Sequence, residues 1–360
     1  MNVQTQTYPE TLPAEFADGH TAWTSPSNIA LVKYWGKYDN QIPANPSISI
    51  TLSACHTKTE MEWSAAENGP EVEFYFEGKA NEAFGNKIKK FLESQLPQRP
   101  YLSGMRFRLE SENTFPHSAG IASSASGMSA FCMCLVEMER RVFGLHADDA
   151  SFYREASILS RLASGSASRS VYGGLVSWGA IDALPETSDL FASKYEGKVH
   201  PDFRGLQDSI IICDRGEKSV SSRAGHGLMK TNPYATRRFE HARENMDALL
   251  QAIGEGDFNR FAELVENEAL TLHGMMMMSY PWFILMKPKT LELLDIMKQY
   301  REQHGIRMCF TLDAGPNIHL IYPESEKEKV HAFLENEIAK HLPENSIIFD
   351  KEGNGPVKLK

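Results

Sequence analysis

Hydrophobic and polar residues alternate strictly in three stretches of the first third of the chain. In the clearest of them, Met105, Phe107 and Leu109 are separated by charged residues. Alternation with a period of two places the apolar side chains on one face of an extended chain and is typical of half-buried antiparallel strands. The pattern therefore predicts strands over residues 57–63, 72–76 and 105–109.

Apolar residues recur with helical spacing along most of the remaining chain. One long run, Ser124–Phe143, is mostly apolar, which predicts a buried helix. Asn232 precedes Pro233 and Gly254 follows Ile253, so an amphipathic helix is expected between them. Further helices are predicted at 87–95, 149–162, 258–271, 288–304 and 324–341, and short apolar strands at 209–213, 308–312 and 318–322.

The order of these elements indicates the fold class. Strands and helices are grouped and do not alternate regularly, which is typical of an α+β protein. Residues 1–20 are polar, contain prolines and are expected to form a loose leader. The polar, turn-rich stretch 185–205 predicts a boundary between two lobes, 21–200 and 201–360. The run Met275–Met278 is interpreted as core filler or as a mobile hydrophobic wall.

Composition and charge exclude several classes of protein. A formal net charge of −10 argues against nucleic acid or an anionic membrane as the main partner, because both require a basic surface. No secretory signal pattern or membrane-spanning apolar run is visible. The five cysteines are odd in number and lack a CxxC pair, so reduced thiols are expected rather than disulfides or a zinc site. By elimination, the cytoplasm is the expected compartment.

The segment Pro116–Gly127 is rich in small residues and lies between a predicted strand and the long buried helix. Small residues at Gly120 and Ala122 let the backbone approach a ligand closely, and free N–H groups at a helix start bind anions. Ser123 and Ser124 add hydroxyl groups for phosphate oxygens or a metal. The alternative is a tightly packed turn with a serine N-cap. The segment does not have the GK[ST] ending of a Walker loop.

Two lysines follow an apolar run in the segment Ser25–Lys37. Lys33 and Lys37 are four residues apart, with Trp35 and Gly36 between them. One interpretation is a cationic binding loop. The other is a solvated strand end whose lysines lay their stems on apolar surface, although a large aromatic residue beside a glycine argues against it.

A third segment, Ala163–Gly174, combines serines with one arginine. Ser164 and Ser166 offer hydroxyl groups, and Arg169 can hold a carboxylate with both arms of its guanidinium. An ordinary polar loop is the alternative.

A fourth segment, Thr311–Asn317, places Asp313 in a Gly-Pro turn between two apolar strands. A carboxylate there can orient or deprotonate a hydroxyl group, whereas the alternative is a simple Asx turn. Together the four segments supply an anion loop, two lysines, an arginine and an aspartate. These parts suit phosphoryl transfer, which depends on positioning and positive charge more than on covalent chemistry.

The four segments also resemble, in the same chain order, the motifs of the diphosphomevalonate decarboxylases in the GHMP kinase superfamily. The matching stretches are SPSNIALVKYWGK, GIASSASG, SGSASRSVYGG and TLDAGPN, and the resemblance covers about residues 22–320. It implies a two-lobed GHMP-kinase-like α+β fold, with an N-terminal lobe like ribosomal protein S5 and a ferredoxin-like C-terminal lobe. It also implies a homodimer.

The resemblance implies a reaction and a place in isoprenoid biosynthesis. Mg²⁺ and ATP would serve to phosphorylate the 3-hydroxyl of mevalonate 5-diphosphate, and loss of that phosphate would drive decarboxylation to isopentenyl diphosphate. Asp313 would orient or deprotonate the hydroxyl, Arg169 would hold the substrate carboxylate, and Lys33 would lie near the reacting oxygen. The remaining substrate-binding residues it implies are Tyr34, Lys37, Ser164 and Ser166.

The nucleotide site follows from the same resemblance. The residues expected to cradle the ATP phosphates are Gly120, Ala122, Ser123, Ser124 and Ser222, with Ser124 also as a magnesium ligand.

Two alternative functions stay open. One is a decarboxylase of mevalonate 5-phosphate or a 3-kinase. The other is a GHMP-fold ligand sensor without activity, although such a sensor is expected to lack Asp313, Arg169 or the lysines.

Overall fold

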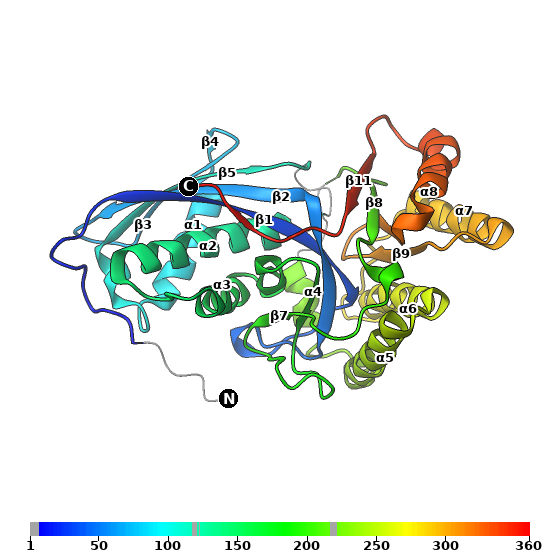
Figure 1. The fold of residues 1–360 in the computed structure, drawn as a ribbon, viewed down its shortest axis with the longest axis horizontal. Helices are drawn as coiled ribbons and strands as arrows, with labels where there is room; N and C mark the ends of the chain where they lie inside the picture. Colours follow the sequence, from blue (N-terminus) through cyan, green and yellow to red (C-terminus); the bar gives the residue numbers. More distant parts are fainter. Residues whose placement is uncertain (1–6, 117–120, 122, 217–221) are drawn as a thin grey trace.

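Two β-sheets with flanking helices form the molecule (Figure 1). The computed structural model describes residues 7–116, 121, 123–216 and 222–360, the side chains of residues 222 and 223 excepted. Among the described residues, no helix is both long enough and apolar enough to cross a membrane. The five cysteines are free thiols, as predicted, and all but Cys213 are buried.

The first sheet contains eight strands among the described residues. Its main path runs β12-β1-β2-β5-β3-β4, and β6 pairs with β2 and β7. The β3–β5 pair is parallel and the other pairs are antiparallel. The strands are β1 Gly19–Val32, β2 Ser47–Ala65, β3 Glu71–Phe76, β4 Lys79–Ala80, β5 Met105–Asn113, β6 Leu175–Trp178, β7 Ala192–Lys194 and β12 Val357–Lys358.

Three helices pack against this sheet: α1 (Glu82–Gln95), α2 (Ser123–Phe143) and α3 (Asp149–Ala163). In β5, Met105, Phe107 and Leu109 are fully buried while the charged residues between them are exposed, which confirms the predicted alternation. Asn81 begins α1 and Asp148 begins α3, each accepting a hydrogen bond from a backbone N–H of the first turn.

The second sheet is antiparallel with the order β11-β8-β10-β9. Its strands are β8 Gln207–Ile211, β9 Cys309–Leu312, β10 Ile318–Tyr322 and β11 Ile347–Lys351. The helices after β8 are α4 Ser222–Leu228, α5 Ala235–Glu255, α6 Phe258–Met277, α7 Pro288–His304 and α8 Lys327–Phe333. Gly256 and Gly305 adopt left-handed conformations directly after α5 and α7, which allows the chain to turn there.

A shared core joins the two sheets. Ile29 and Ile50 of the first sheet belong to the same buried cluster as Ile210 of the second sheet and Met246 and Val265 of α5 and α6. The opposite face of the second sheet packs on α7 and α8. Because β1 and β2 run from the first sheet into this shared core, their ends are held rigidly between the two halves.

Several predicted boundaries were wrong. α1 begins five residues earlier than expected, at Glu82. The expected helix at 324–341 is divided into a 3₁₀ turn, α8, a π-helical turn and a further 3₁₀ turn. β2 extends well beyond the alternating stretch 57–63. No strand was predicted over β1, because β1 is buried on nearly all sides and therefore shows no alternation. Asn232 does not cap α5, which starts at Ala235.

The methionine run continues α6 past the predicted end at residue 271. Met275 and Met276 are buried in a small cluster with Trp35 and Leu285, so half of the run fills the core. Met277 and Met278 are 43% and 45% exposed.

Candidate active site

The centre of the site is an ion pair between residues that follow strands of the two sheets. Lys33 comes directly after β1 and Asp313 directly after β9, and Lys33 Nζ lies 3.1 Å from Asp313 Oδ1. Lys33 is buried, whereas the Asp313 side chain is 30% exposed. Burial lowers the pKa of Lys33, and the nearby Asp313 opposes this shift. A carboxylate that is partly accessible beside a buried ammonium group can accept a hydrogen bond from an incoming ligand.

Arg169 lies beside this pair on the 3₁₀ helix Gly165–Val171. Its Nε donates to Asn28 Oδ1 at 3.2 Å and one terminal nitrogen donates to Ser47 Oγ at 2.6 Å. Burial lowers its pKa to about 10, and the negative charge of Asp313 opposes the shift. Arg169 therefore stays cationic at neutral pH while two neutral partners fix its orientation.

Tyr34 and Lys37 continue the chain beyond Lys33. The Tyr34 ring lies 4.6 Å from that of Trp178 and 4.4 Å from that of His226. Within the described part of the chain, its buried hydroxyl group has no hydrogen-bond partner. A buried polar atom without a partner costs free energy unless a ligand satisfies it. Lys37 donates from Nζ to Gln41 Oε1 at 2.6 Å.

Gly165 lets the serine-containing segment approach Tyr34 closely. A Cβ atom at Gly165 would lie 2.8 Å from the Tyr34 hydroxyl oxygen, so a larger residue there would displace the ring. Ser164 and Ser166 are half-buried on either side of this glycine. The Ser166 carbonyl accepts a hydrogen bond from Asn28 Nδ2 at 3.3 Å. The structure thus brings together Lys33, Asp313, Arg169 and Tyr34, with both serines adjacent.

The predicted phosphate-binding segment is described in part. Ser123 and Ser124 are the first two residues of α2, where unpaired backbone N–H groups and the helix dipole favour anions. Gly120 and Ala122 lie outside the described residues, and Ser222 is the first residue of α4 with its side chain outside them. Among the described residues, no group of three or more His, Cys, Asp or Glu is arranged to hold a metal.

The chain matches known protein families along most of its length. Residues 25–190 match the family described as diphosphomevalonate decarboxylase-like N-terminal domain, and residues 209–357 match the mevalonate 5-diphosphate decarboxylase C-terminal domain. The diphosphomevalonate decarboxylase of Candida albicans is 31% identical over 334 residues, which cover 89% of this chain and 88% of that protein. The chain belongs to the diphosphomevalonate decarboxylase family.

Solved structures of this family have the same fold. The mevalonate diphosphate decarboxylase of Staphylococcus aureus aligns with a TM-score of 0.81 at 27% identity, covering 96% of this chain and 99% of that one. A structure of MDDEF in complex with MVAPP, AMPPCP and magnesium also aligns with a TM-score of 0.81, at 29% identity over 96% of this chain and all of that one. The predicted α+β, GHMP-kinase-like fold is confirmed.

Two histidines beside the site were not anticipated from the sequence. His226 of α4 accepts a hydrogen bond at Nδ1 from the Gly36 N–H at 3.0 Å, and burial lowers its pKa to about 3. His273 of α6 lies with Nε2 3.1 Å from the Asp313 carbonyl oxygen, and burial lowers its pKa to about 4. Both are neutral at physiological pH. No local motif surrounds either residue, so only the fold reveals them.

Proposed function

We propose that this protein catalyses the ATP-dependent decarboxylation of mevalonate 5-diphosphate to isopentenyl diphosphate, with phosphorylation of the 3-hydroxyl as the first step. The observation that carries the proposal is the accessible Asp313 carboxylate held 3.1 Å from the buried Lys33 ammonium group, beside Arg169. Membership of the family and the related complex with MVAPP, AMPPCP and magnesium support the choice of substrate and nucleotide.

In the first step Asp313 accepts the hydrogen bond, and then the proton, of the 3-hydroxyl group as its oxygen attacks the terminal phosphate of ATP. Lys33 keeps Asp313 ionised, because a neighbouring positive charge favours the charged form of a carboxyl group. The same ammonium group stabilises negative charge on the attacking oxygen. Since both side chains are positioned before substrate binds, little reorganisation is required during the reaction.

In the second step the new tertiary phosphate leaves C3, and positive charge develops there. The C–C bond to the carboxylate then breaks, its electron pair forms the new double bond and CO₂ departs. Arg169 is assigned to hold that carboxylate, because its planar guanidinium is fixed by Asn28 and Ser47. Burial of Arg169 and Lys33 limits access of water to the cationic intermediate.

Tyr34 and Lys37 are assigned to the diphosphate of the substrate. The unpartnered hydroxyl of Tyr34 can donate to a phosphate oxygen, and Lys37 is only half-buried. Ser164 and Ser166 are assigned to the wall of the same pocket.

The start of α2 fits the nucleotide. Ser123, Ser124, Gly120 and Ala122 are assigned to the ATP phosphates, together with Ser222. A magnesium ion bound with ATP would take most of its ligands from phosphate and water, and the Ser124 hydroxyl would supply a ligand from the protein. When bound, the ion neutralises charge on the transferred phosphate.

We further assign residues 21–200 and 201–360 to two lobes after a leader at 1–20, the protein to the cytoplasm, and its assembly to a homodimer. Light scattering coupled to size-exclusion chromatography tests the assembly: a mass near 80 kDa, about twice the 40.4 kDa chain, supports the dimer and a mass near one chain refutes it.

Product analysis tests the proposed activity. The protein is incubated with Mg-ATP and either mevalonate 5-diphosphate or mevalonate 5-phosphate, and ADP, CO₂ and the isoprenoid product are measured. Equal amounts of ADP and CO₂ from the diphosphate, with little from the monophosphate, support the proposal. Better turnover of the monophosphate, or ADP release without CO₂, overturns it. The Asp313→Asn variant serves as the control for contaminating activity.

A further inference from the structure

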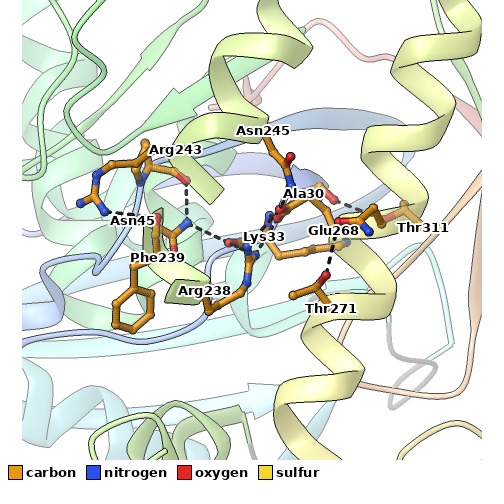
Figure 2. A network of polar contacts seen from close by, with 12 residues as sticks. Ala30, Lys33, Asn45, Arg238, Phe239, Arg243, Asn245, Glu268, Thr271 and Thr311 are labelled. Carbon is orange, nitrogen blue, oxygen red and sulfur yellow. Dashed lines mark hydrogen bonds and ion pairs between the residues drawn. The ribbon is translucent and has the colours of Figure 1, made fainter. Parts of the chain in front are cut away.

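A buried network from α5 and α6 surrounds the backbone of Lys33. Figure 2 shows Glu268 of α6 in one network of polar contacts with Lys33, Arg238 and Asn245. Glu268 Oε2 accepts the Lys33 backbone N–H at 2.9 Å. The Lys33 carbonyl oxygen accepts from Asn45 Nδ2 at 3.0 Å and from Arg238 at 3.4 Å. Lys33 lies just beyond the end of β1. These side chains therefore make the hydrogen bonds to its N–H and C=O groups that a neighbouring strand makes inside a sheet.

Glu268 and Arg238 form a bidentate ion pair in the interior. Two nitrogens of Arg238 donate to the two carboxylate oxygens of Glu268 at 2.9 and 2.6 Å, and Asn245 Nδ2 donates to Oε1 at 2.7 Å. The Glu268 carboxylate thus receives four hydrogen bonds, counting that from Lys33. Bidentate arginine–carboxylate pairs fix geometry strongly. A buried pair seldom stabilises a fold more than apolar residues of equal size, so a role in positioning is the better account.

The same helix also holds the partner of Lys33. His273 lies five residues after Glu268 on α6, and its Nε2–H donates to the Asp313 carbonyl oxygen at 3.1 Å. The proton must be on Nε2, because a carbonyl oxygen only accepts. α6 therefore contacts the backbone of Lys33 through Glu268 and the backbone of Asp313 through His273. One rigid element spans both ends of the 3.1 Å ion pair at the centre of the site.

We propose that the Glu268–Arg238 pair is a positioning unit for Lys33, which sets the distance of its ammonium group from Asp313 for the chemical step. The inference rests on the function proposed above, since it gives Lys33 and Asp313 their roles. Neither Glu268 nor Arg238 touches the reacting atoms. Their loss lowers kcat rather than substrate affinity, because the misplaced group acts in the transition state.

The test replaces the pair by apolar residues of similar size, Glu268→Leu with Arg238→Met, so that no unpaired charge stays buried. The matched control is Glu266→Leu with Arg301→Met. This second pair also links α6 to a neighbouring helix through two hydrogen bonds, at 2.5 and 3.2 Å, but does not contact Lys33. We expect kcat of the first variant to fall by tenfold to about a hundredfold, the size that a misplacement of about 1 Å produces. KM and ATP affinity stay near the wild-type values, and the control keeps its kcat.

Non-additivity separates positioning from general support of the fold. Lys33→Met is measured in wild type and in the Glu268→Leu/Arg238→Met background. If the pair acts through Lys33, the Lys33→Met substitution lowers kcat much less in the double-variant background than in the wild-type protein. Three results would overturn the inference. They are an equal loss of kcat from Lys33→Met in both backgrounds, an unchanged kcat in a folded double variant, and a fall of kcat in the control as large as in the double variant.

Two further measurements keep the outcome decisive. If the double variant does not fold, Glu268→Gln replaces it in the same comparison, because it keeps the shape of the side chain and removes the charge. A wild-type protein that releases no CO₂ refutes the proposed function. The positioning inference is then judged separately by a crystal structure of the double variant, in which the Lys33–Asp313 distance must exceed about 4 Å, the limit for an ion pair.

Discussion

Protonation of His226 is expected to make the protein sensitive to acid. The ring lies between Tyr34 and Trp35, at centroid distances of 4.4 and 4.7 Å, and Nδ1 accepts the Gly36 N–H. A proton on Nδ1 would remove this acceptor and bring a buried positive charge near Lys37 and Arg169. The folded state therefore resists protonation down to about pH 3, whereas an unfolded histidine takes up its proton near pH 6.5.

The size of the effect follows from these two pKa values. Below about pH 6.5 the unfolded state binds one more proton than the folded state, so stability falls as the pH falls, until the folded pKa of about 3 is reached. Between pH 7 and pH 5 this difference removes about 2 kcal/mol from the free energy of unfolding. That amount is a large fraction of the stability of an ordinary domain.

The assay compares wild type with His226→Asn. The asparagine amide oxygen can replace Nδ1 as acceptor for the Gly36 N–H, and the residue does not titrate. Urea unfolding followed by tryptophan fluorescence at pH 7 and pH 5 gives the free energy of unfolding for each protein. Wild type is expected to lose about 2 kcal/mol more than the variant over this range. Contributions from other groups, including His273, are present in both proteins and cancel.

Equal losses of stability in the two proteins would refute the reasoning, because they would show that His226 is not held neutral by the fold. A larger loss in the variant would refute it equally. The absolute stability of His226→Asn at pH 7 does not enter the comparison, since loss of the aromatic contacts alone lowers it.

The remaining predictions concern catalysis. Asp313→Asn should reduce turnover by about a hundredfold or more, since a general base is lost, while ATP affinity measured by calorimetry stays near wild type; a wild-type rate would contradict the role given to this residue. Arg169→Lys should also lower kcat severely, because an ammonium group cannot maintain the hydrogen bonds to Asn28 and Ser47 together with a bidentate contact to substrate; full activity in a steady-state assay would contradict this. Removal of magnesium with EDTA should abolish ADP release and excess Mg²⁺ should restore it, whereas activity that persists in EDTA would contradict the role of the ion.

The sequence predicted those parts of the site that lie in local motifs. Arg169 and Asp313 are surrounded by small or turn-forming residues, Lys33 follows an apolar run, and the structure brings all three together. Three strands of the second sheet were also predicted closely, with β10 at the expected residues 318–322, because short apolar runs bounded by turn-forming residues are consistent with buried strands. The fourth strand, β11, was not predicted.

The features that the sequence did not predict depend on contacts between residues that are distant in the sequence. Glu268 looks like any glutamate of an amphipathic helix, yet it is fully buried and accepts the N–H of Lys33, 235 positions away. His226 likewise accepts a hydrogen bond from the Gly36 N–H, which lies 190 positions away in the sequence. β1 could not be recognised by alternation because residues on both of its faces are buried. Such features follow from tertiary packing, which no local pattern contains.

The pairing of β12 with β1 has a consequence for the order of folding in the cell. Trp23 and Thr24 pair with Lys358 and Val357, and Thr21 donates to the carbonyl of Lys360, 339 positions further on. On the ribosome, one edge of the first sheet must therefore wait until the whole second half has been synthesised. Until then the unpaired edge of β1 is open to wrong partners. A fragment that stops near residue 200 would retain this exposed edge permanently, so we expect it to aggregate during expression.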